Sequence, residues 1–363
     1  MLGRFVAEQY NTKAYKLISD EVVTELMKSD IRIANLESPI YGGKSDDSLK
    51  FAADEDLLDQ FKWVDCFSLS NNHINDFGTQ GMIETITSFK RKELICNGLY
   101  TDIYQPFIIE QNNEKIAIIT CADMMNYEFS DNCPYKTLRV NRSEIIVNYI
   151  KKYKLKGYFV VLYAHVGMLF TRYPNPLIRD FVHNMIDEGA DCIVTAHPHC
   201  LGGHEYYKNK LIVYSLGDFL MDGASFRRRR SGILNIQISG GKIEEWGIIP
   251  VETTMDLSVV FPNKKNEKKM MKSFDNVSCK IAKHSDSYLS FYKIQYKKEL
   301  LAHSWSTIIF EYKRRGLAGL VKTLFKRIGA VKGMARRVVT DRSTMSYDAD
   351  AIEEKNISMK DIR

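Results

Sequence analysis

Short runs of consecutive apolar residues alternate along the chain with segments whose apolar residues recur at helical spacing. Runs of this kind are typical of strands that are buried on both faces of a sheet. The predicted strands are residues 31–36, 66–70, 115–122, 157–165, 191–197 and 210–219. The predicted helices are residues 20–30, 54–64, 80–93 and 176–188. Strands that alternate with helices predict an α/β sheet with helices on both faces.

The later part of the chain has a different pattern. Residues 232–252 predict a β-hairpin that turns at a Gly-Gly pair. Residues 313–337 hold nine Lys or Arg and no acidic residue, and their apolar residues recur at helical spacing. We therefore predict a main domain at 1–252 and a helical, basic C-terminal region at 253–363, with a mobile tail from about residue 341.

Three interpretations of the basic segment at 313–337 remain open. It fits a helix that lies on an anionic membrane surface, one that packs on the main domain, or one that contacts a partner such as a polymer-synthesis enzyme. No nucleic-acid partner is expected, because aromatic residues do not interleave with the basic ones.

Composition places the chain in the ordinary globular class. Its 363 residues are 45% hydrophobic and 26% charged, with a formal net charge of +6. The seven cysteines form no CxxC pair, which favours reduced thiols in the cytoplasm over a disulfide framework. No apolar run reaches about 18 residues, and Met1 does not open a signal peptide. We expect a cytoplasmic protein, either free or held peripherally at the inner face of the membrane.

Polar side chains stand where the predicted strands end. In α/β sheets, functional groups collect at the carboxyl ends of the strands. The residues at or just past such ends are Asn35, Glu37, Asn72, His73, His165, His197 and His199. We expect them to converge at one edge of one sheet.

This set combines a carboxylate, amides and four imidazoles, which suits Mn, Fe or Zn without distinguishing among them. Two such ions about 3.5–4 Å apart can clamp the attacking and leaving oxygens of a phosphoryl displacement. A carboxylate can bridge the two ions, and an imidazole that binds neither ion can protonate the leaving group.

The chain contains the motifs NLE, NNHxxDxG, HVG, GAD with HPH, and YSLGDF. With these motifs it resembles the capsule-synthesis CapA family, which is linked to poly-γ-glutamate assembly in bacteria. That family is similar in fold to the calcineurin-like metallophosphoesterases. The resemblance covers about residues 1–250 and implies a four-layer α/β/β/α sandwich with a pocket for two divalent metal ions.

The resemblance also implies roles for individual residues. The implied metal ligands are Glu37 as the bridging carboxylate, Asn72, His165 and His197 on one ion, and His199 on the other. His73 resembles the catalytic imidazole, and Asp76 is the candidate to orient it. Asn35 is expected to lie next to the ligands and to take part in substrate binding.

Three departures from the family pattern bear on activity. The family's first strand ends in a Gly-Asp pair whose Asp ligates metal. In this chain the corresponding pair would lie upstream of Met1. Either the natural start is further upstream or this ligand has been lost. The family's HWGxE reads HVGML, with Val166 for Trp and Leu169 for Glu. Asp218 replaces an Asn of SLGNF and is either an extra cation contact near the substrate or a cap of its loop.

The run at 225–232 contains four consecutive arginines beside the SLGDF loop. Arg227, Arg228 and Arg229 either belong to a solvated loop or clamp an anionic polymer or a phosphorylated substrate near the metals.

These patterns predict a CapA-like metal-dependent hydrolase or transferase that takes part in the synthesis of a capsule or of a poly-γ-glutamate-type surface polymer. The alternative is a non-catalytic assembly or binding factor with a degenerate metallophosphoesterase site. The missing Asp and Leu169 favour the alternative, whereas the four retained pocket histidines favour the enzyme.

Overall fold

The computed structural model describes residues 2–3, 6–7, 10, 16–43, 50–123, 125–223 and 225–340, with side chains up to residue 317. A six-stranded sheet forms its centre, in the order β4-β5-β6-β7-β9-β8. Its strands are β4 (Phe107–Gln111), β5 (Glu114–Ala122), β6 (Phe159–His165), β7 (Cys192–Ala196), β8 (His204–Tyr207) and β9 (Lys210–Tyr214). Strands β5, β6, β7 and β9 are parallel to one another, and β4 and β8 pair antiparallel at the two edges.

Two three-stranded sheets complete the β-structure. One consists of the parallel strands β1 (Ile33–Asn35), β2 (Cys66–Ser68) and β3 (Cys96–Asn97). The other is antiparallel and consists of β10 (Arg230–Ser239), β11 (Lys242–Thr253) and β12 (Val259–Val260). The predicted hairpin is confirmed: Gly240 and Gly241 both have positive φ, as a tight two-residue turn between right-twisted strands requires.

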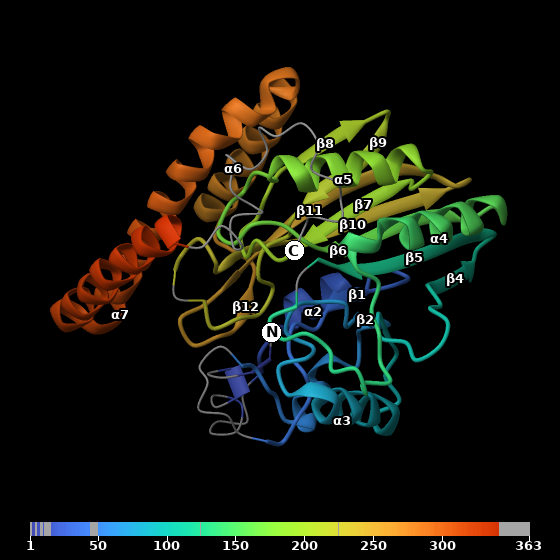
Figure 1. The fold of residues 1–363 in the computed structure, drawn as a ribbon, viewed down its shortest axis with the longest axis horizontal. Coiled ribbons are helices and arrows are strands. Elements are labelled where there is room, and N and C mark those ends of the chain that lie inside the picture. The colour runs from blue at the N-terminus through green and yellow to red at the C-terminus, as the bar shows by residue number, and fades with distance from the viewer. Residues whose placement is uncertain are drawn as a thin grey trace.

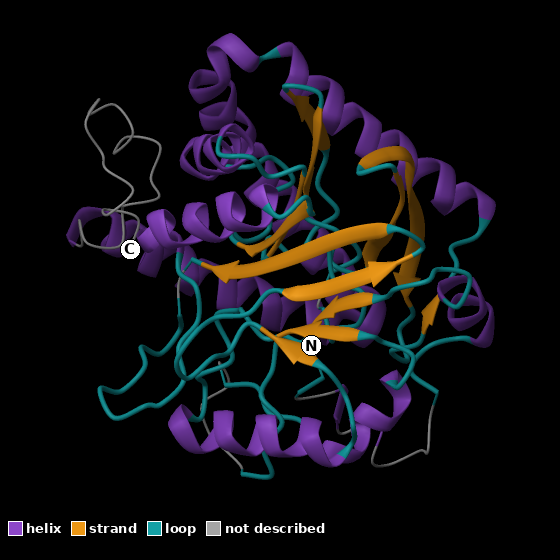
Figure 2. Cartoon of the chain, turned by 90° about the vertical axis from the view of Figure 1, so that its right-hand side faces the viewer, coloured by secondary structure: helices purple, strands orange, loops and turns teal. Residues whose placement is uncertain are grey.

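Helices cover the outside of these sheets, while strands occupy the interior (Figure 2). The helices are α2 (Asp20–Leu26), α3 (Gly78–Arg91), α4 (Ser143–Leu155), α5 (Pro176–Asp187), α6 (Lys264–Lys283) and α7 (Tyr288–Thr340). Short 3-10 turns are η1 (Glu55–Phe61), η2 (Val140–Arg142) and η3 (Ser285–Ser287). Figure 1 shows α4 and α5 lying along the six-stranded sheet, with α2 and α3 beside β1 and β2 at the opposite side of the molecule.

Alternate residues of β6 face two different cores. Leu162 packs toward α4 and α5, whereas Phe159 packs against β11 and α6. A third core lies among α2, α3, β2 and β12 and includes Phe67 and Val259. The expected α/β sandwich is confirmed, because its sheets lie between outer layers of helices. It carries a C-terminal helical part.

Several predicted elements differ in detail. The strand expected at 210–219 ends at Tyr214, because Ser215 turns to a φ of +66°. The segment 54–64 forms only the 3-10 turn η1. The backbone of 313–337 belongs to α7, but Gly316 breaks the helix with a φ of 64°, which glycine adopts without a Cβ clash. The tail from 341 lies outside the described residues.

In Figure 1 the red end of α7 stands clear of the sheets. Among the helices of the described part of the chain, none combines the length and the apolarity that crossing a membrane needs.

Candidate metal centre

The candidate residues follow strands of two different sheets. Glu37 follows β1 and His73 follows β2 in a three-stranded sheet, whereas His165 ends β6 and His197 follows β7 in the six-stranded sheet. The prediction of one sheet edge was therefore wrong, because β1 and β2 pair with each other and not with β5 or β6. The carboxyl ends of both sheets nevertheless meet at one place.

The ligand atoms of this site lie close together. Single donor atoms of Glu37, His197 and His199 all lie within 4.8 Å of one another. Glu37 Oε1 lies 3.5 Å from His165 Nε2 and 3.6 Å from His199 Nε2. Asn72 Oδ1 lies 2.8 Å from His165 Nε2, which lies 3.2 Å from His197 Nδ1. The structure thus brings together all five predicted ligands.

The donor atoms are arranged as a cation would require. Metal–ligand bonds of about 2.0–2.2 Å at ordinary coordination angles separate ligand atoms by roughly 3.0–3.5 Å, which matches these spacings. Glu37 Oε1 and His165 Nδ1 are buried, and no hydrogen bond reaches either atom within the described part of the chain. A buried carboxylate oxygen without a donor is costly unless a cation or a proton meets it, so the residues present fit a divalent metal ion.

Electrostatics favours the charged carboxylate here. Burial raises the pKa of Glu37, but the nearby His199 and His165 outweigh it and hold that pKa well below its ordinary value. Burial lowers the pKa of His197 well below its usual range, and the neighbouring histidines add to this effect. An ionised carboxylate beside a neutral imidazole is the state in which both side chains ligate a metal.

The backbone between the two His ligands is unusual. His197 has a φ of 97° and His199 a φ of 55°, a region that residues with a Cβ rarely adopt. Such conformations cost about 1–3 kcal/mol each and concentrate at functional sites. The turn places both imidazoles on the side of Glu37.

His199 is oriented by Asp218. Asp218 Oδ1 lies 2.6 Å from His199 Nδ1, and Asp218 Oδ2 accepts from Arg228 Nε at 3.3 Å. Burial raises the pKa of Asp218, but the charges of His199 and Arg228 outweigh it, so the carboxyl stays ionised. With Nδ1 held by Asp218, His199 presents Nε2 toward Glu37, as a metal-ligating histidine does.

His73 stands beside the ligands with its own buried carboxylate. Its Nδ1 lies 2.8 Å from Asp76 Oδ2, which also accepts the backbone N–H of Phe51 at 2.8 Å. Asn126 Nδ2 lies 3.0–3.2 Å from the two ring nitrogens, and Asn126 Oδ1 accepts from Asn72 Nδ2 at 3.0 Å. Asn126 therefore connects the ligand Asn72 to the imidazole.

Two functional asparagines were missed at the level of sequence. Asn71 is fully buried, donates to Asn35 Oδ1 at 3.3 Å and to Leu36 O at 2.8 Å, and accepts from the His73 backbone. The NNH motif contained this signal. Asn126 follows β5 in a loop without a motif, so only the fold reveals it.

The side chains of the arginine run have different partners and do not all face the metal centre. Arg229 is buried and donates to the carbonyls of Gly223 and Thr254, and Arg227 pairs with Glu299 of α7. Of the three predicted arginines, Arg228 is the one that contacts Asp218.

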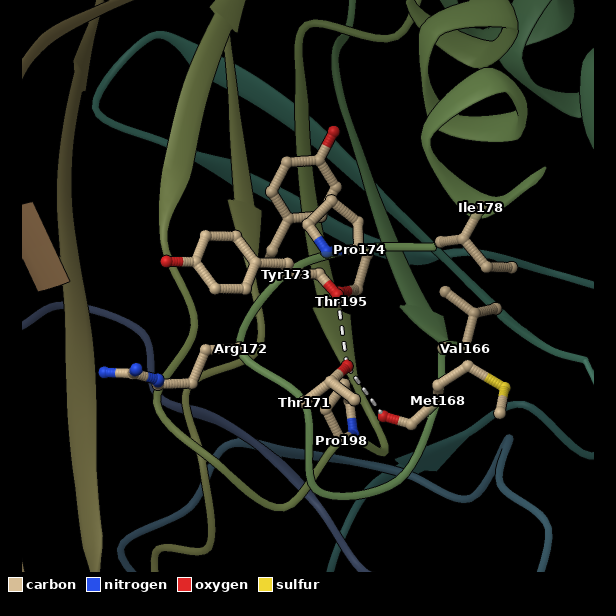
Figure 3. A pocket seen from close by; sticks show the side chains of 11 residues that line it. Val166, Met168, Thr171, Arg172, Tyr173, Pro174, Ile178, Thr195 and Pro198 are labelled. Atoms are coloured by element: carbon tan, nitrogen blue, oxygen red, sulfur yellow. Dashed lines mark hydrogen bonds between the residues drawn. The ribbon is translucent and has the colours of Figure 1, made fainter. Parts of the chain in front are cut away.

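The loop after β6 packs beside the turn formed by His197, Pro198 and His199. Val166 is buried, whereas Leu169 is 40% exposed. Within the loop, Thr171 Oγ1 donates to the carbonyls of Met168 and Tyr173. A cavity of about 10 Å³ lies between the loop and Pro198 (Figure 3). It has room for about one water molecule. Arg172 points away from this cavity (Figure 3).

Comparison with known proteins gives consistent matches. The model of the family described as bacterial capsule synthesis protein PGA_cap matches residues 1–223. The PGA biosynthesis protein CapA of Bacillus subtilis (strain 168) is 26% identical over 262 residues, which cover 69% of each chain. The capsule biosynthesis protein CapA of Bacillus anthracis is 27% identical over 267 residues, covering 69% of this chain and 65% of that protein. The chain thus spans about two thirds of these relatives.

Among solved structures, a similar one is the sulfate thiohydrolase SoxB of Thermus thermophilus in complex with glycerol. The two share 14% sequence identity at a TM-score of 0.39, over 64% of this chain and 39% of that one.

Proposed function

The chain belongs to the bacterial capsule synthesis protein family PGA_cap, and from this premise we propose that it is a metal-dependent hydrolase or transferase acting in the assembly of a poly-γ-glutamate-type capsule polymer. Family membership and the CapA relatives support a role in capsule synthesis. The reaction, the two divalent ions and the anionic substrate are parts of the proposal.

One observation carries the catalytic proposal. Glu37 Oε1 is a buried carboxylate oxygen that accepts no hydrogen bond within the described residues, and it faces the Nε2 atoms of His165 and His199. A protein without a ligand for this site would leave that oxygen unsatisfied at a cost of about 1–3 kcal/mol or more.

Bound divalent ions would supply Lewis-acid polarisation of the phosphoryl or acyl oxygen of the substrate. His73 would exchange a proton with the leaving group at Nε2, because Asp76 accepts the proton on Nδ1. Asn126, whose Oδ1 accepts from Asn72 Nδ2, lies against the His73 ring and would limit its movement relative to the ligands.

Two chromogenic probes test the proposal and separate the bond classes. The chain, supplied with Mn²⁺ or Zn²⁺, is assayed on bis(p-nitrophenyl) phosphate and on γ-glutamyl-p-nitroanilide. Hydrolysis of either probe that needs the metal and disappears in Glu37→Gln supports the enzyme. Equal rates in the wild-type chain and in Glu37→Gln on both probes would refute it.

A second candidate is a binding role at a membrane, favoured by the exposed face of α7. Four apolar residues at heptad-like spacing are 50–64% exposed on this face: Ile294, Leu301, Trp305 and Tyr312. Lys297 and Lys298 are exposed beside this apolar stripe. Apolar and aromatic residues flanked by lysine match an anionic lipid surface, which would hold the protein at the inner membrane face during polymer assembly.

A further inference from the structure

A second, larger cavity lies beside Cys200 and Leu201, the two residues that follow the turn at 197–199. It has a volume of about 220 Å³ and is bounded by the segment after His199, the loop after β6, the start of β10 and one face of α6. A single water needs only about 10–15 Å³ by this kind of measure, so the cavity has room for a group of many atoms.

Cations dominate the lining of this cavity. Arg172, Arg227, Arg230 and Lys269 line it, and no Asp or Glu does. The carboxylate of Glu299 neutralises part of this positive charge. It accepts hydrogen bonds from Arg172 Nε at 3.0 Å and Arg172 Nη2 at 2.8 Å, and it also forms an ion pair with Arg227.

Arg230 and Lys269 are not neutralised in this way. Neither side chain forms an ion pair with a described residue of the chain. Two of the four cations around the cavity therefore have no carboxylate partner among the described residues. Clustered positive charges raise the local potential and favour the entry of an anion.

The cavity is connected to the metal centre by consecutive residues. Cys200, which lines it, directly follows the ligand His199. Arg227, which also lines it, precedes Arg228, and Arg228 holds Asp218, the partner of His199. The cavity therefore adjoins the residues that hold and orient the ligand His199.

We propose that this basic pocket binds an oxyanion group, a carboxylate or a phosphate, on the substrate that the metal centre acts on. The proposal rests on the function proposed above. Guanidinium forks match both groups, since each can accept two parallel N–H bonds. Ser273, which accepts from Arg172 Nη1 at 2.6 Å, fixes that guanidinium at the α6 wall of the pocket.

Titration calorimetry of the full chain tests the pocket, with a γ-linked glutamate trimer and inorganic phosphate as separate probes. The double variant Arg230→Gln/Lys269→Gln is expected to weaken binding of the preferred probe at least about tenfold, as loss of charged hydrogen bonds predicts. Lys268→Gln, one residue from the pocket lining on α6, is expected to change binding less than about twofold. Arg230→Lys keeps the charge but loses the fork, and should fall between them.

The outcomes separate the pocket from the metal centre. Binding by metal-stripped protein that the double variant loses would support the pocket even if no ion were needed. Binding that vanishes in Glu37→Gln but is unchanged in the double variant would overturn the pocket and leave the metal function standing. Failure of both probes to bind the wild-type chain at millimolar concentration would overturn the pocket as well. Unchanged melting temperature and metal content in the double variant exclude misfolding as the cause of a loss.

Discussion

Asp218 Oδ1 lies 2.6 Å from His199 Nδ1, and this contact turns His199 Nε2 toward the carboxylate of Glu37. Carboxylates that hold the second nitrogen of a ligating histidine typically change metal affinity by about 10–100-fold. Asp218 is therefore expected to position His199 for metal binding. The sequence alone suggested either a cation contact or a cap of the loop.

Asp218→Asn is expected to weaken divalent metal binding by about 10–100-fold while the fold is kept. The variant keeps the size of the side chain and loses the charge that orients His199. Competition of the purified chain against a fluorescent zinc chelator measures this affinity. Asp275→Asn, on the exposed side of α6, is the control, and equal affinity in both variants would remove Asp218 from the site.

His73→Asn is expected to lower kcat on the hydrolysed probe by about 10²–10⁴-fold, because a general acid contributes on that order. Its metal content should stay that of the wild-type chain, since His73 bonds to Asp76 and not to Glu37. His284→Asn, remote from the centre, serves as the control. Loss of metal together with activity would instead make His73 a ligand.

Glu299 is expected to make the docking of α7 sensitive to acid. Burial raises the pKa of Glu299, but the hydrogen bonds and charges of Arg172 and Arg227 outweigh it and hold the pKa below its ordinary value. A depressed carboxyl pKa contributes stability above the unfolded value of about 4.3 and loses it as pH falls through the folded value. The stabilisation is thus complete at pH 7 and is lost progressively as the pH falls below about 4.3 and through the folded value.

Glu299→Gln should lower the free energy of unfolding at pH 7 by roughly 2–3 kcal/mol, less than for a fully buried pair because both arginines are partly exposed. Between pH 5 and 3 its stability should fall less than that of the wild-type chain. Urea unfolding followed by fluorescence at each pH measures both. The exposed Glu267→Gln on α6 is the control, and parallel pH curves for Glu299→Gln and wild type would contradict the assignment.

Leu301→Ala is expected to weaken binding to vesicles that contain anionic lipid by roughly tenfold, because it removes apolar area from the exposed stripe of α7. Leu155→Ala is the matched control, since Leu155 is 89% exposed at the end of α4, away from α7. Co-sedimentation at two salt concentrations measures the binding, which should weaken with salt. Equal losses in the two variants would argue against a membrane-facing α7.

The local chemistry of the site was readable from the sequence because each buried strand ends abruptly on a polar residue. Glu37, His165 and His199 could be placed at such ends without any knowledge of the fold. Their division between two sheets could not, because strand pairing such as that of Ile33 with Cys66 depends on contacts far apart in the chain.

Arginine and asparagine were harder to assign than histidine. The run at 225–232 reads as a solvated or anion-binding loop, yet Arg229 is buried against backbone carbonyls. The basic pocket draws on Arg172, Arg230 and Lys269, and Asn126 joins the site from a loop after β5. Spacing along the chain does not encode such groupings, since tertiary packing alone brings these segments together.

The most direct test of the account is the metal content of the purified chain, compared with Glu37→Gln after exposure to excess Mn²⁺ or Zn²⁺ and dialysis. Inductively coupled plasma mass spectrometry should find at least one retained ion per wild-type chain and only traces in the variant. The same trace content in both chains would contradict a metal centre at Glu37, and with it the proposed hydrolase.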